Sequence, residues 1–222
     1  MAQRSKRPAA RASRASAARA AGRAGTGRRD ELLTIAADLF ATGGYASTTV
    51  RDIADAAGIL SGSLYHHFSS KEEMADAILS GFLEDVLAQY DEIVAAREPA
   101  RETFAALVSA TLLAMDRHQS AVVIYQNDGR QLAALERFAY LRDAGGRFEA
   151  AWTEVLQRGI DEGEFRRSLD VPLAYRLIRA ALWTVASWYR SGGEHSAPEI
   201  ADHYVAMLLD GIARGRRKKA KD

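Results

Sequence analysis

The 222-residue sequence lacks cysteine altogether, and it has no apolar run of about 18 residues, the length that a membrane-spanning helix needs. The absence of cysteine excludes a disulfide framework and thiolate metal sites, and it suits a reducing compartment. Because 48% of the residues are hydrophobic, a core can form without such staples. We therefore expect a cytoplasmic protein with no membrane partner.

The common sequence signatures of catalysis are also missing. There is no Gly-x-Ser-x-Gly elbow, no Gly-x-Gly-x-x-Gly, no P-loop and no His-Glu-x-x-His. The run Asp161, Glu162 and Glu164 could supply paired carboxylates, but adjacent acids at a helix end are commonly solvated. The sequence therefore predicts a protein that is not an enzyme and that needs no cofactor.

Signals for β-strands are absent too. Beyond Pro99 the apolar residues recur at helical spacing, without alternating runs, internal repeats or Asn-Gly turns. We expect an all-α fold of about nine helices. Their expected positions are residues 28–43, 50–57, 62–68, 71–96, 104–117, 121–125, 132–162 (weakened or bent at Gly145-Gly146), 171–190 and 198–215.

The most informative stretch runs from Ser47 to Lys71. Thr49 and Asp52 form a capping box that begins a helix, and Gly58 ends it, because a left-handed backbone there costs glycine nothing. Ser61 is expected to cap a second short helix, whose buried side carries Leu64 and Phe68. A helix, a short turn containing glycine and a second helix make a helix-turn-helix.

The outward side chains of the second helix suit a nucleic acid. They are small, hydroxylic, imidazole or aromatic groups, and no carboxylate occurs between Gly58 and Lys71, so the surface tolerates phosphate. A helical hairpin within a core remains an alternative. A metal site at His66 and His67 is disfavoured, because neighbouring helix residues do not face each other and no further ligand is near in sequence.

These residues resemble a known family. The pattern Thr-Val-Arg-Asp-Ile-Ala, Ala-Gly, Ser-Gly-Ser-Leu-Tyr-His-His-Phe, Lys-Glu-Glu-Met is similar to the DNA-binding end of TetR-family repressors. The resemblance implies base contacts for Arg51 and Ser63 and a phosphate contact for Lys71. His66 lies at a position where the residue varies among family members. The full set of candidate DNA-binding residues is Thr49, Arg51, Ser61, Gly62, Ser63, Tyr65, His66, His67 and Lys71.

Within the resemblance, Gly62 keeps the groove contact close, and Thr49, Tyr65 and His67 join Lys71 in holding phosphates. Lys71 lies in the first turn of a helix, where a cation opposes the helix dipole, so a nearby phosphate would explain its placement. A solvated surface lysine is the alternative.

The formal net charge of +1 hides a strong asymmetry. Residues 1–29 carry nine basic side chains and no acid, and residues 214–222 carry six basic side chains and one acid. Between them, 15 basic and 28 acidic residues leave a net charge of −13. The expected organisation is a disordered basic tail (1–27), a three-helix DNA-binding domain (28–72), a helical ligand-binding and dimerisation domain (73–213) and a basic C-terminal tail (214–222).

The N-terminal tail has more than one interpretation. It could add sequence-independent phosphate contacts, it could be a transit peptide, or it could be translated from an upstream start and have no role. A protein that coats DNA through such basic tails, without sequence preference or ligand response, is an alternative for the whole chain.

The last two helices carry apolar stripes that could pack inside the monomer or against a second copy. By the family resemblance they form a four-helix bundle in a homodimer, which reads a palindromic operator in double-stranded DNA with half-sites about 34 Å or a multiple apart. The expected interface residues are Leu182, Val185, Tyr189, Tyr204, Met207 and Leu208.

Two guanidiniums and an indole share one side of the helix expected at 171–190. Arg176, Arg179 and Trp183 lie three and four residues apart, a spacing that favours either a cation–π or salt-bridge contact within the chain or a site for an anionic ligand with a flat group. The residue pattern alone leaves both open.

The chain beyond the helix-turn-helix also resembles a branch of the TetR family that represses steroid catabolism, through Val122-Val-Ile-Tyr-Gln126, Tyr175-Arg176 and Trp188-Tyr-Arg190 among other segments. The resemblance implies that a small-molecule inducer releases the repressor, and that this inducer is a CoA thioester of a steroid-ring remnant. A fatty acyl-CoA, an aromatic compound or a drug is the alternative. The implied ligand residues are Tyr125, Gln126, Arg176, Arg179 and Trp183.

Overall fold

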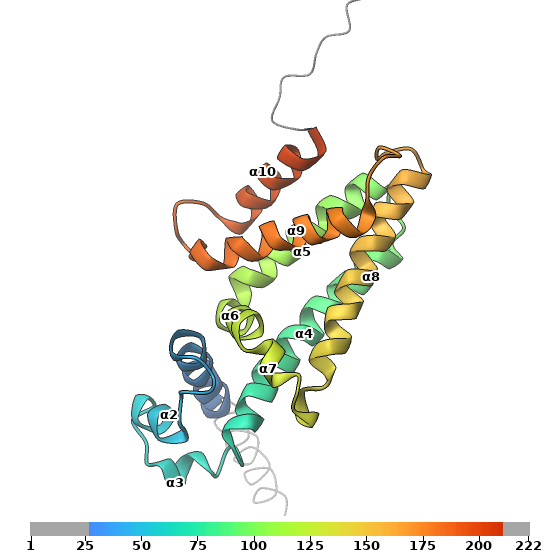
Figure 1. The fold of residues 1–222 in the computed structure, drawn as a ribbon. Coiled ribbons are helices and arrows are strands. Elements are labelled where there is room, and N and C mark those ends of the chain that lie inside the picture. Colours follow the sequence, from blue (N-terminus) through green and yellow to red (C-terminus); the bar gives the residue numbers. More distant parts are fainter. Residues whose placement is uncertain (1–26, 211–222) are drawn as a thin grey trace, which may run out of the picture. The chain divides into compact units, whose positions relative to one another are not determined.

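The computed structural model describes residues 27–210, so the tail predicted at 214–222 and nearly all of the tail predicted at 1–27 lie outside the described residues. The chain divides into two compact units, one up to Ile78 and the other from Leu79 onward. Within the described residues every regular element is a helix, and the prediction of an all-α fold is confirmed (Figure 1).

The first unit contains a helix over residues 27–43, α2 (Val50–Ala56), α3 (Ser61–Leu64) and the first turns of α4 (Lys71–Ala95). The capping box at the start of α2 is present, since Thr49 N donates to Asp52 Oδ2 at 2.8 Å and Asp52 N donates to Thr49 Oγ1 at 3.2 Å. Gly58 has a φ of 65°, as its role in ending α2 requires. The core of this unit includes Leu32, Ala36, Phe40, Ile53, Ala54, Leu64, Phe68 and Met74.

The start of α3 differs from the prediction. The N-cap residue is Leu60 instead of Ser61, and no side chain caps this helix. After Leu64 the chain continues as turns, in which His67 N and Phe68 N both donate to Leu64 O. The region predicted as one short helix is therefore a single helical turn followed by further turns, and it still buries Leu64 and Phe68.

The second unit is built around α5 (Ala100–Arg117), which contacts α6, α8, α9 and α10. The rest of α4 belongs to this unit as well. The remaining elements are α6 (Gln119–Asn127), α7 (Gly129–Leu132), the 3-10 helix η1 (Glu136–Phe138), α8 (Tyr140–Asp161), α9 (Val171–Trp188) and α10 (Ala197–Asp210) (Figure 1).

The prediction of one long helix over residues 132–162 was wrong at its beginning. The chain forms α7 and η1 first, and α8 begins only at Tyr140. Leu132 and Phe138 are both buried, although six positions along one helix place side chains about 120° apart. The breaks between these short elements allow both side chains to enter the core. From Tyr140 on, α8 runs through Gly145 and Gly146 without interruption.

The end of α8 depends on close packing against a glycine. Gly163 has a φ of 81°, and the chain then turns back so that Phe165 N donates to Gly159 O at 2.8 Å. The Phe165 ring lies against Gly159, where a Cβ atom would come within 2.2 Å of Phe165 Cδ2. Gly159 is therefore required for this contact.

We expect Gly159→Ala to lower the free energy of unfolding by about 1 to 3 kcal/mol, because the methyl group would force the Phe165 ring out of its place. Gly146→Ala, in the same helix with open space around it, is the matched control and should raise stability by about 1 kcal/mol. Urea denaturation of both variants measures the difference. Similar shifts for the two variants would show that Phe165 does not constrain Gly159.

Candidate functional site

The candidate DNA-binding residues lie in the first unit, and most of them are exposed. Arg51, Gly62, Ser63, Tyr65 and His66 are exposed, whereas Ser61 and His67 are half-buried. The Arg51 guanidinium is 3.7 Å from the Asp55 carboxylate, and both side chains are at least 70% exposed, so this ion pair holds Arg51 only weakly. These side chains are therefore available to a partner molecule.

Leu60 is an exposed residue that the sequence reasoning missed. Its side chain is 80% exposed, and as the N-cap of α3 it occupies a position where Ser, Thr, Asp or Asn would stabilise the helix by about 1 kcal/mol. The sequence could have indicated this exposed position, because Leu60 directly precedes Ser61, the residue predicted as the N-cap. Leu60 belongs with the exposed residues around α3.

Lys71 is engaged within the chain. Its ammonium Nζ donates to Tyr45 O at 2.7 Å and to Thr48 O at 2.9 Å, with Ala46 O at 3.4 Å. It also lies 4.3 Å from the centre of the Tyr45 ring. A solvated surface lysine therefore does not describe this arrangement, and the phosphate contact implied by the family resemblance stays a prediction.

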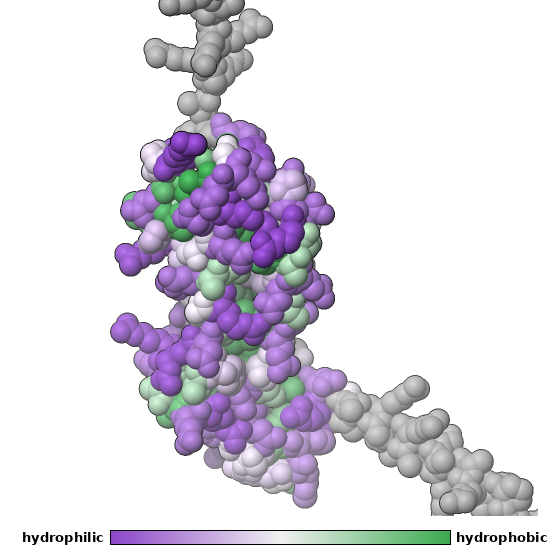
Figure 2. All heavy atoms as spheres, turned by 90° about the vertical axis from the view of Figure 1, so that its right-hand side faces the viewer, coloured by the Kyte–Doolittle hydropathy of each residue, from purple (hydrophilic) through white to green (hydrophobic). Residues whose placement is uncertain are grey.

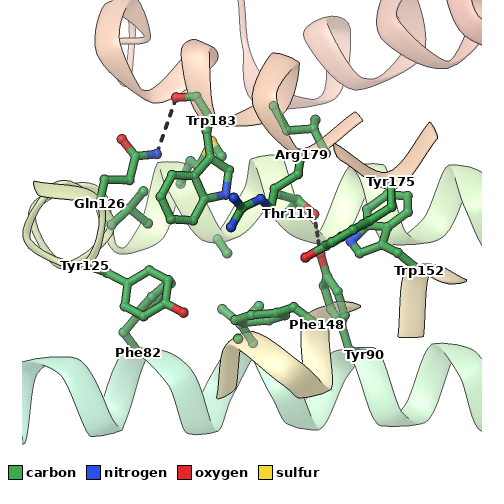
Figure 3. Close-up of a pocket in the computed structure, with 16 residues that line it drawn as sticks. Phe82, Tyr90, Thr111, Tyr125, Gln126, Phe148, Trp152, Tyr175, Arg179 and Trp183 are labelled. Atoms are coloured by element: carbon green, nitrogen blue, oxygen red, sulfur yellow. Dashed lines mark hydrogen bonds between the residues drawn. The ribbon is translucent and has the colours of Figure 1, made fainter. Parts of the chain in front are cut away.

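The second unit contains an aromatic cavity of about 80 Å³, shown in Figure 3. Side chains from α4, α5, α6, α8 and α9 line it, and Arg179 is the one charged residue among them. The lining residues are Phe82, Val86, Tyr90, Thr111, Ala114, Met115, Val122, Tyr125, Gln126, Gly145, Phe148, Trp152, Tyr175, Arg179, Leu182 and Trp183.

Four of the five predicted ligand residues meet at this cavity. The Arg179 guanidinium lies 5.2 Å from the Trp183 ring, and the Trp183 and Tyr125 rings are 5.8 Å apart (Figure 3). Gln126 Nε2 donates to Trp183 O at 3.3 Å. The cation–π contact that the spacing favoured is therefore present, and it forms part of the cavity wall.

Arg176 does not line the cavity. It is exposed, and it lies seven residues, or about 10 Å along α9, from Trp183. Tyr175 is buried and lines the cavity beside Arg179. The cavity therefore extends along α9 past the level of Arg176, and Arg176 is left out because its neighbour Tyr175 takes the position that faces the cavity.

The tyrosines of the cavity remain protonated at neutral pH. Burial raises the pKa of Tyr90 to about 12, and its hydroxyl lies 2.6 Å from Thr111 Oγ1. Burial also raises the pKa of Tyr125 and Tyr175, against the opposing effect of the Arg179 charge. The cavity thus combines aromatic walls, hydroxyl donors and one guanidinium, which suits a flat apolar group with a carbonyl or anionic part.

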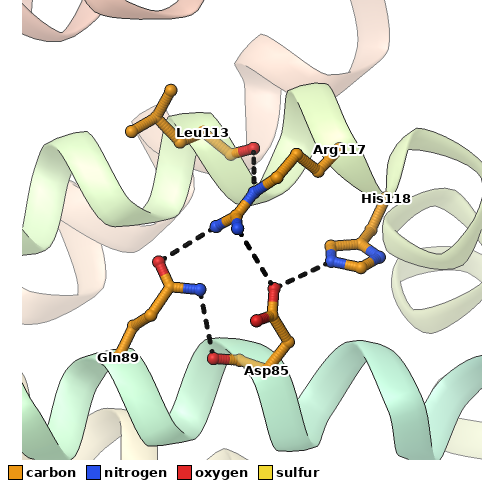
Figure 4. A network of polar contacts seen from close by, with 5 residues as sticks. All are labelled: Asp85, Gln89, Leu113, Arg117 and His118. Atoms are coloured by element: carbon orange, nitrogen blue, oxygen red, sulfur yellow. Dashed lines mark hydrogen bonds and ion pairs between the residues drawn. The ribbon is translucent and has the colours of Figure 1, made fainter.

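A polar network joins α4 to the junction of α5 and α6 (Figure 4). His118 Nε2 lies 2.9 Å from Asp85 Oδ2, and Arg117 approaches the same carboxylate at 3.5 Å and donates to Gln89 Oε1 at 3.0 Å. The ring of Phe82, three residues before Asp85, lies 5.7 Å from the His118 ring and also lines the cavity. The cavity wall and this network therefore share α4.

Four of the six predicted interface residues are buried inside the protomer, so that part of the prediction was wrong. Leu182 lines the cavity, Val185 is buried, Tyr189 Oη donates to Asp116 Oδ1 at 2.6 Å, and Tyr204 Oη donates to Ile178 O at 3.2 Å. Leu182 and Val185 lie on α9, Tyr189 directly follows it and Tyr204 lies on α10, and all four face the core of their own protomer. Periodicity marks an apolar face but does not say which neighbour covers it.

Met207 and Leu208 are exposed, at 39% and 43%, and with Leu173 (52%) and Leu177 (63%) they line a groove of about 910 Å³ between α9 and α10. The sequence analysis did not include Leu173 and Leu177 among the interface residues, because they lie on the face of α9 opposite to the apolar stripe that contains Leu182 and Val185. On the face drawn in Figure 2, hydrophilic residues predominate, and apolar residues appear among them in patches. Exposed apolar side chains gathered in one groove are typical of an interaction surface.

Comparison with known proteins gives two family matches. Residues 32–78 match the family described as bacterial regulatory proteins, tetR family, and residues 97–212 match the tetracyclin repressor-like C-terminal domain. The HTH-type transcriptional repressor KstR2 of Rhodococcus jostii is 51% identical over 188 residues, which cover 85% of this chain and 92% of the relative. KstR2 of Mycobacterium tuberculosis is 48% identical over 187 residues, 84% of this chain and 94% of the relative.

Solved structures agree with these matches. The structure of the ketosteroid transcriptional regulator KstR2 of Mycobacterium tuberculosis superimposes with a TM-score of 0.80, covering 84% of this chain and 95% of that one at 48% identity. The regulator PfmR of Thermus thermophilus gives a TM-score of 0.72 at 30% identity, covering 82% of this chain and 99% of that one. None of the helices within residues 27–210 is long and apolar enough to cross a membrane.

The network around Asp85 predicts a pH dependence of stability. The hydrogen bond from His118 and the charge of Arg117 hold the pKa of the Asp85 carboxyl below its ordinary value of 3.8. A carboxyl whose pKa is lowered in the folded state stabilises the fold above its unfolded pKa, and that stability is lost as the pH falls through the folded pKa. The wild type should therefore be more stable than Asp85→Asn above pH 4, and the difference should fade below it.

Thermal melting across pH 2.5 to 7 checks this expectation, with Glu84→Gln, an exposed neighbour on α4, as the control for the loss of one negative charge. A difference between wild type and Asp85→Asn that persists unchanged at the acid end would contradict the assignment of the network.

Proposed function

Because the chain belongs to the TetR family of bacterial transcriptional regulators and is close to the KstR2 repressors, we propose that it is a homodimeric repressor released from a palindromic operator by a CoA thioester of a steroid-ring fragment. The observation that carries the ligand proposal is a single guanidinium, Arg179, stacked beside Trp183 in an otherwise uncharged aromatic cavity. One of the similar solved structures is that of a ketosteroid transcriptional regulator, which supports the same class of ligand.

The exposed residues around α2 and α3 supply the proposed DNA contacts. Arg51 and Ser63 are exposed and are proposed to read base edges, with Gly62 allowing close approach. Thr49, Tyr65 and His67 are proposed to contact phosphates, which position the protein without reading sequence. A binder without sequence preference is the alternative, and competition of specific against random duplex in a gel shift separates the two.

A second copy of this chain is the proposed occupant of the groove between α9 and α10. The groove exposes Leu173, Leu177, Met207 and Leu208, and a two-fold interface would bring the same apolar patch from each protomer together. Such a dimer presents two copies of the first unit to DNA. A repressor of this kind acts in the cytoplasm, at the nucleoid, and performs no catalysis.

The inducer is proposed to enter the aromatic cavity with its ring part. Ligand pockets for molecules of this size commonly hold about 300 Å³ or more, whereas this cavity holds about 80 Å³, so binding requires the walls to move apart. Arg179 would pair with an anionic or carbonyl oxygen, and Trp183 would pack against the thioester arm. A ligand that binds the widened form better shifts the population toward that form. A fatty acyl-CoA, an aromatic compound or a drug is the alternative inducer.

Leu177→Glu should convert the dimer to a monomer, because a carboxylate at the centre of an apolar two-fold interface would be desolvated twice. Operator affinity should fall by about tenfold or more, since half-sites would be bound independently. Analytical ultracentrifugation and gel shift measure the two effects. Leu113→Glu, at an exposed leucine of α5 outside the groove, is the control and should remain dimeric. A dimeric Leu177→Glu variant would place the interface elsewhere.

Arg179→Ala and Trp183→Ala should each weaken inducer binding by about ten- to hundredfold, because each removes a charge-assisted hydrogen bond or a packing contact made with ligand. Operator affinity should hardly change, so these variants would repress without responding. Arg176→Ala is the matched control, one turn away on the same helix and outside the cavity, and should respond as the wild type does.

Calorimetry of inducer binding, together with operator affinity and melting temperature, decides between the ligand role and a purely structural one. If the Arg179–Trp183 contact only stabilises the packing of α9, both variants should melt at a lower temperature and bind the operator more weakly. A destabilised variant with an ordinary inducer response would refute the ligand assignment.

A further inference from the structure

Leu60 is an exposed leucine in the turn between α2 and α3. It is the N-cap of α3 with an extended backbone, no side chain caps that helix, and the Leu60 side chain is 80% exposed. The adjacent Ile59 is half-buried and Leu64 is buried, so the core of the first unit takes apolar residues on either side of Leu60 and leaves its side chain outside. Neither capping nor core packing therefore explains a leucine at this position.

Hydrogen bonds fix the backbone on both sides of Leu60. Ile59 N donates to Ala54 O at 3.0 Å, which ties the turn to α2. Ser63 N donates to Leu60 O at 2.8 Å, which begins α3. Gly58, with its φ of 65°, sets the direction in which the chain leaves α2. The Leu60 side chain is thus presented to solvent from a backbone that is fixed within the helix-turn-helix.

The apolar surface around Leu60 is too small for a protein partner. Within residues 27–78, the exposed large hydrophobic side chains are those of Leu60 and Tyr65, whereas specific protein interfaces cover about 800 Å² on each partner. The three residues that follow Leu60 are serine, glycine and serine, which add little apolar area. A single leucine in such surroundings matches an apolar group of about the size of a methyl group.

The charge around Leu60 suits DNA. No Asp or Glu occurs from Gly58 to Lys71, and Arg51 on α2 is an exposed cation of the same unit. In helix-turn-helix proteins the second helix lies in the major groove with its first residues at the base edges. The one apolar group that base pairs present in that groove is the C5-methyl group of thymine. An exposed leucine that precedes α3 therefore has one partner of matching chemistry in DNA.

We propose that Leu60 contacts the C5-methyl group of a thymine in each operator half-site and so contributes an apolar element to sequence preference. The proposal rests on the operator binding proposed above. Arg51 and Ser63 are proposed to read hydrogen-bonding groups of the bases, whereas Leu60 distinguishes thymine from the other bases by its methyl group alone. This role also accounts for a leucine where a capping side chain would stabilise α3 better.

The test removes the methyl group from the DNA and the leucine from the protein, separately and together. An operator duplex is selected from a random library with the full-length wild type. Each thymine is then replaced by deoxyuridine, which keeps the hydrogen-bonding groups of thymine and lacks the methyl group. Fluorescence anisotropy measures the affinities of the wild type and of Leu60→Ala for every duplex.

At one thymine in each half-site, deoxyuridine should lower wild-type affinity by about fourfold, because the burial of one methyl group is lost. Leu60→Ala should bind the duplexes with thymine and with deoxyuridine at that position equally, since the protein partner of the methyl group is already removed. Leu60→Met, which keeps an apolar side chain of similar volume, should retain most of the difference.

Leu135→Ala is the matched control. Leu135 is 48% exposed and, like Leu60, is the N-cap of a short helix without a side-chain capping bond. It lies in the second unit, however, and lines neither the aromatic cavity nor the groove between α9 and α10. Leu135→Ala should therefore show the same loss with deoxyuridine as the wild type.

Thermal melting separates a DNA contact from a structural role. Leu60→Ser should melt at the wild-type temperature or above it, because serine is a favourable N-cap, and should still lose the dependence on the methyl group. If Leu60 only shapes the turn, its variants should weaken binding to every duplex alike, and the wild type and Leu60→Ala should show equal deoxyuridine losses at every thymine. That result would overturn the proposal.

The same data separate this proposal from the proposed function. A wild type that binds the selected duplex tightly and specifically, but whose affinity no deoxyuridine changes, would contradict the role of Leu60 alone. A wild type that binds random duplex as tightly as the selected one would contradict operator recognition, and the role of Leu60 with it.

Discussion

The proposed regulation by a small molecule would depend on the volume of the aromatic cavity in the second unit. At about 80 Å³ the cavity accommodates a few water molecules, and a ring system cannot enter until its walls separate. Those walls are packed side chains, which have discrete arrangements and do not deform continuously. Binding of the proposed ligand would thereby be coupled to movement of helices, because the packed walls must separate before a ring system enters.

The helix α4 forms one wall of this cavity. It contributes Phe82, Val86 and Tyr90 to the cavity and Asp85 to the polar network with His118, and its first turn carries Lys71 in the unit that bears the DNA-binding residues. The continuous helix α4 therefore carries side chains that line the cavity and also a side chain of the unit with the candidate DNA-binding residues. Under the proposed function, the ligand and the operator would need no shared contact to influence each other, because each would bias the position of α4.

Local sequence rules predicted those features that depend on neighbouring residues. The Thr49 capping box and the Gly58 turn are confirmed, because capping and a positive φ are decided within a few residues. The start of α8 and the buried faces of α9 were predicted wrongly, because packing of distant elements decides whether an apolar face meets its own core or a second copy. Lys71 illustrates the same limit, since its partners lie 23 to 26 residues earlier in the chain.

The most direct test of the account is the reciprocity between the two ligands. Operator affinity is measured with and without a ring-derived CoA thioester, and thioester affinity is measured with and without the operator. The account predicts that both ratios are equal and that each lies at about fivefold or more, because a coupling free energy acts identically in both directions. Free CoA and tetracycline should leave operator affinity unchanged. Tight thioester binding without any effect on operator affinity would contradict the account, and so would release by a compound that does not bind at the cavity.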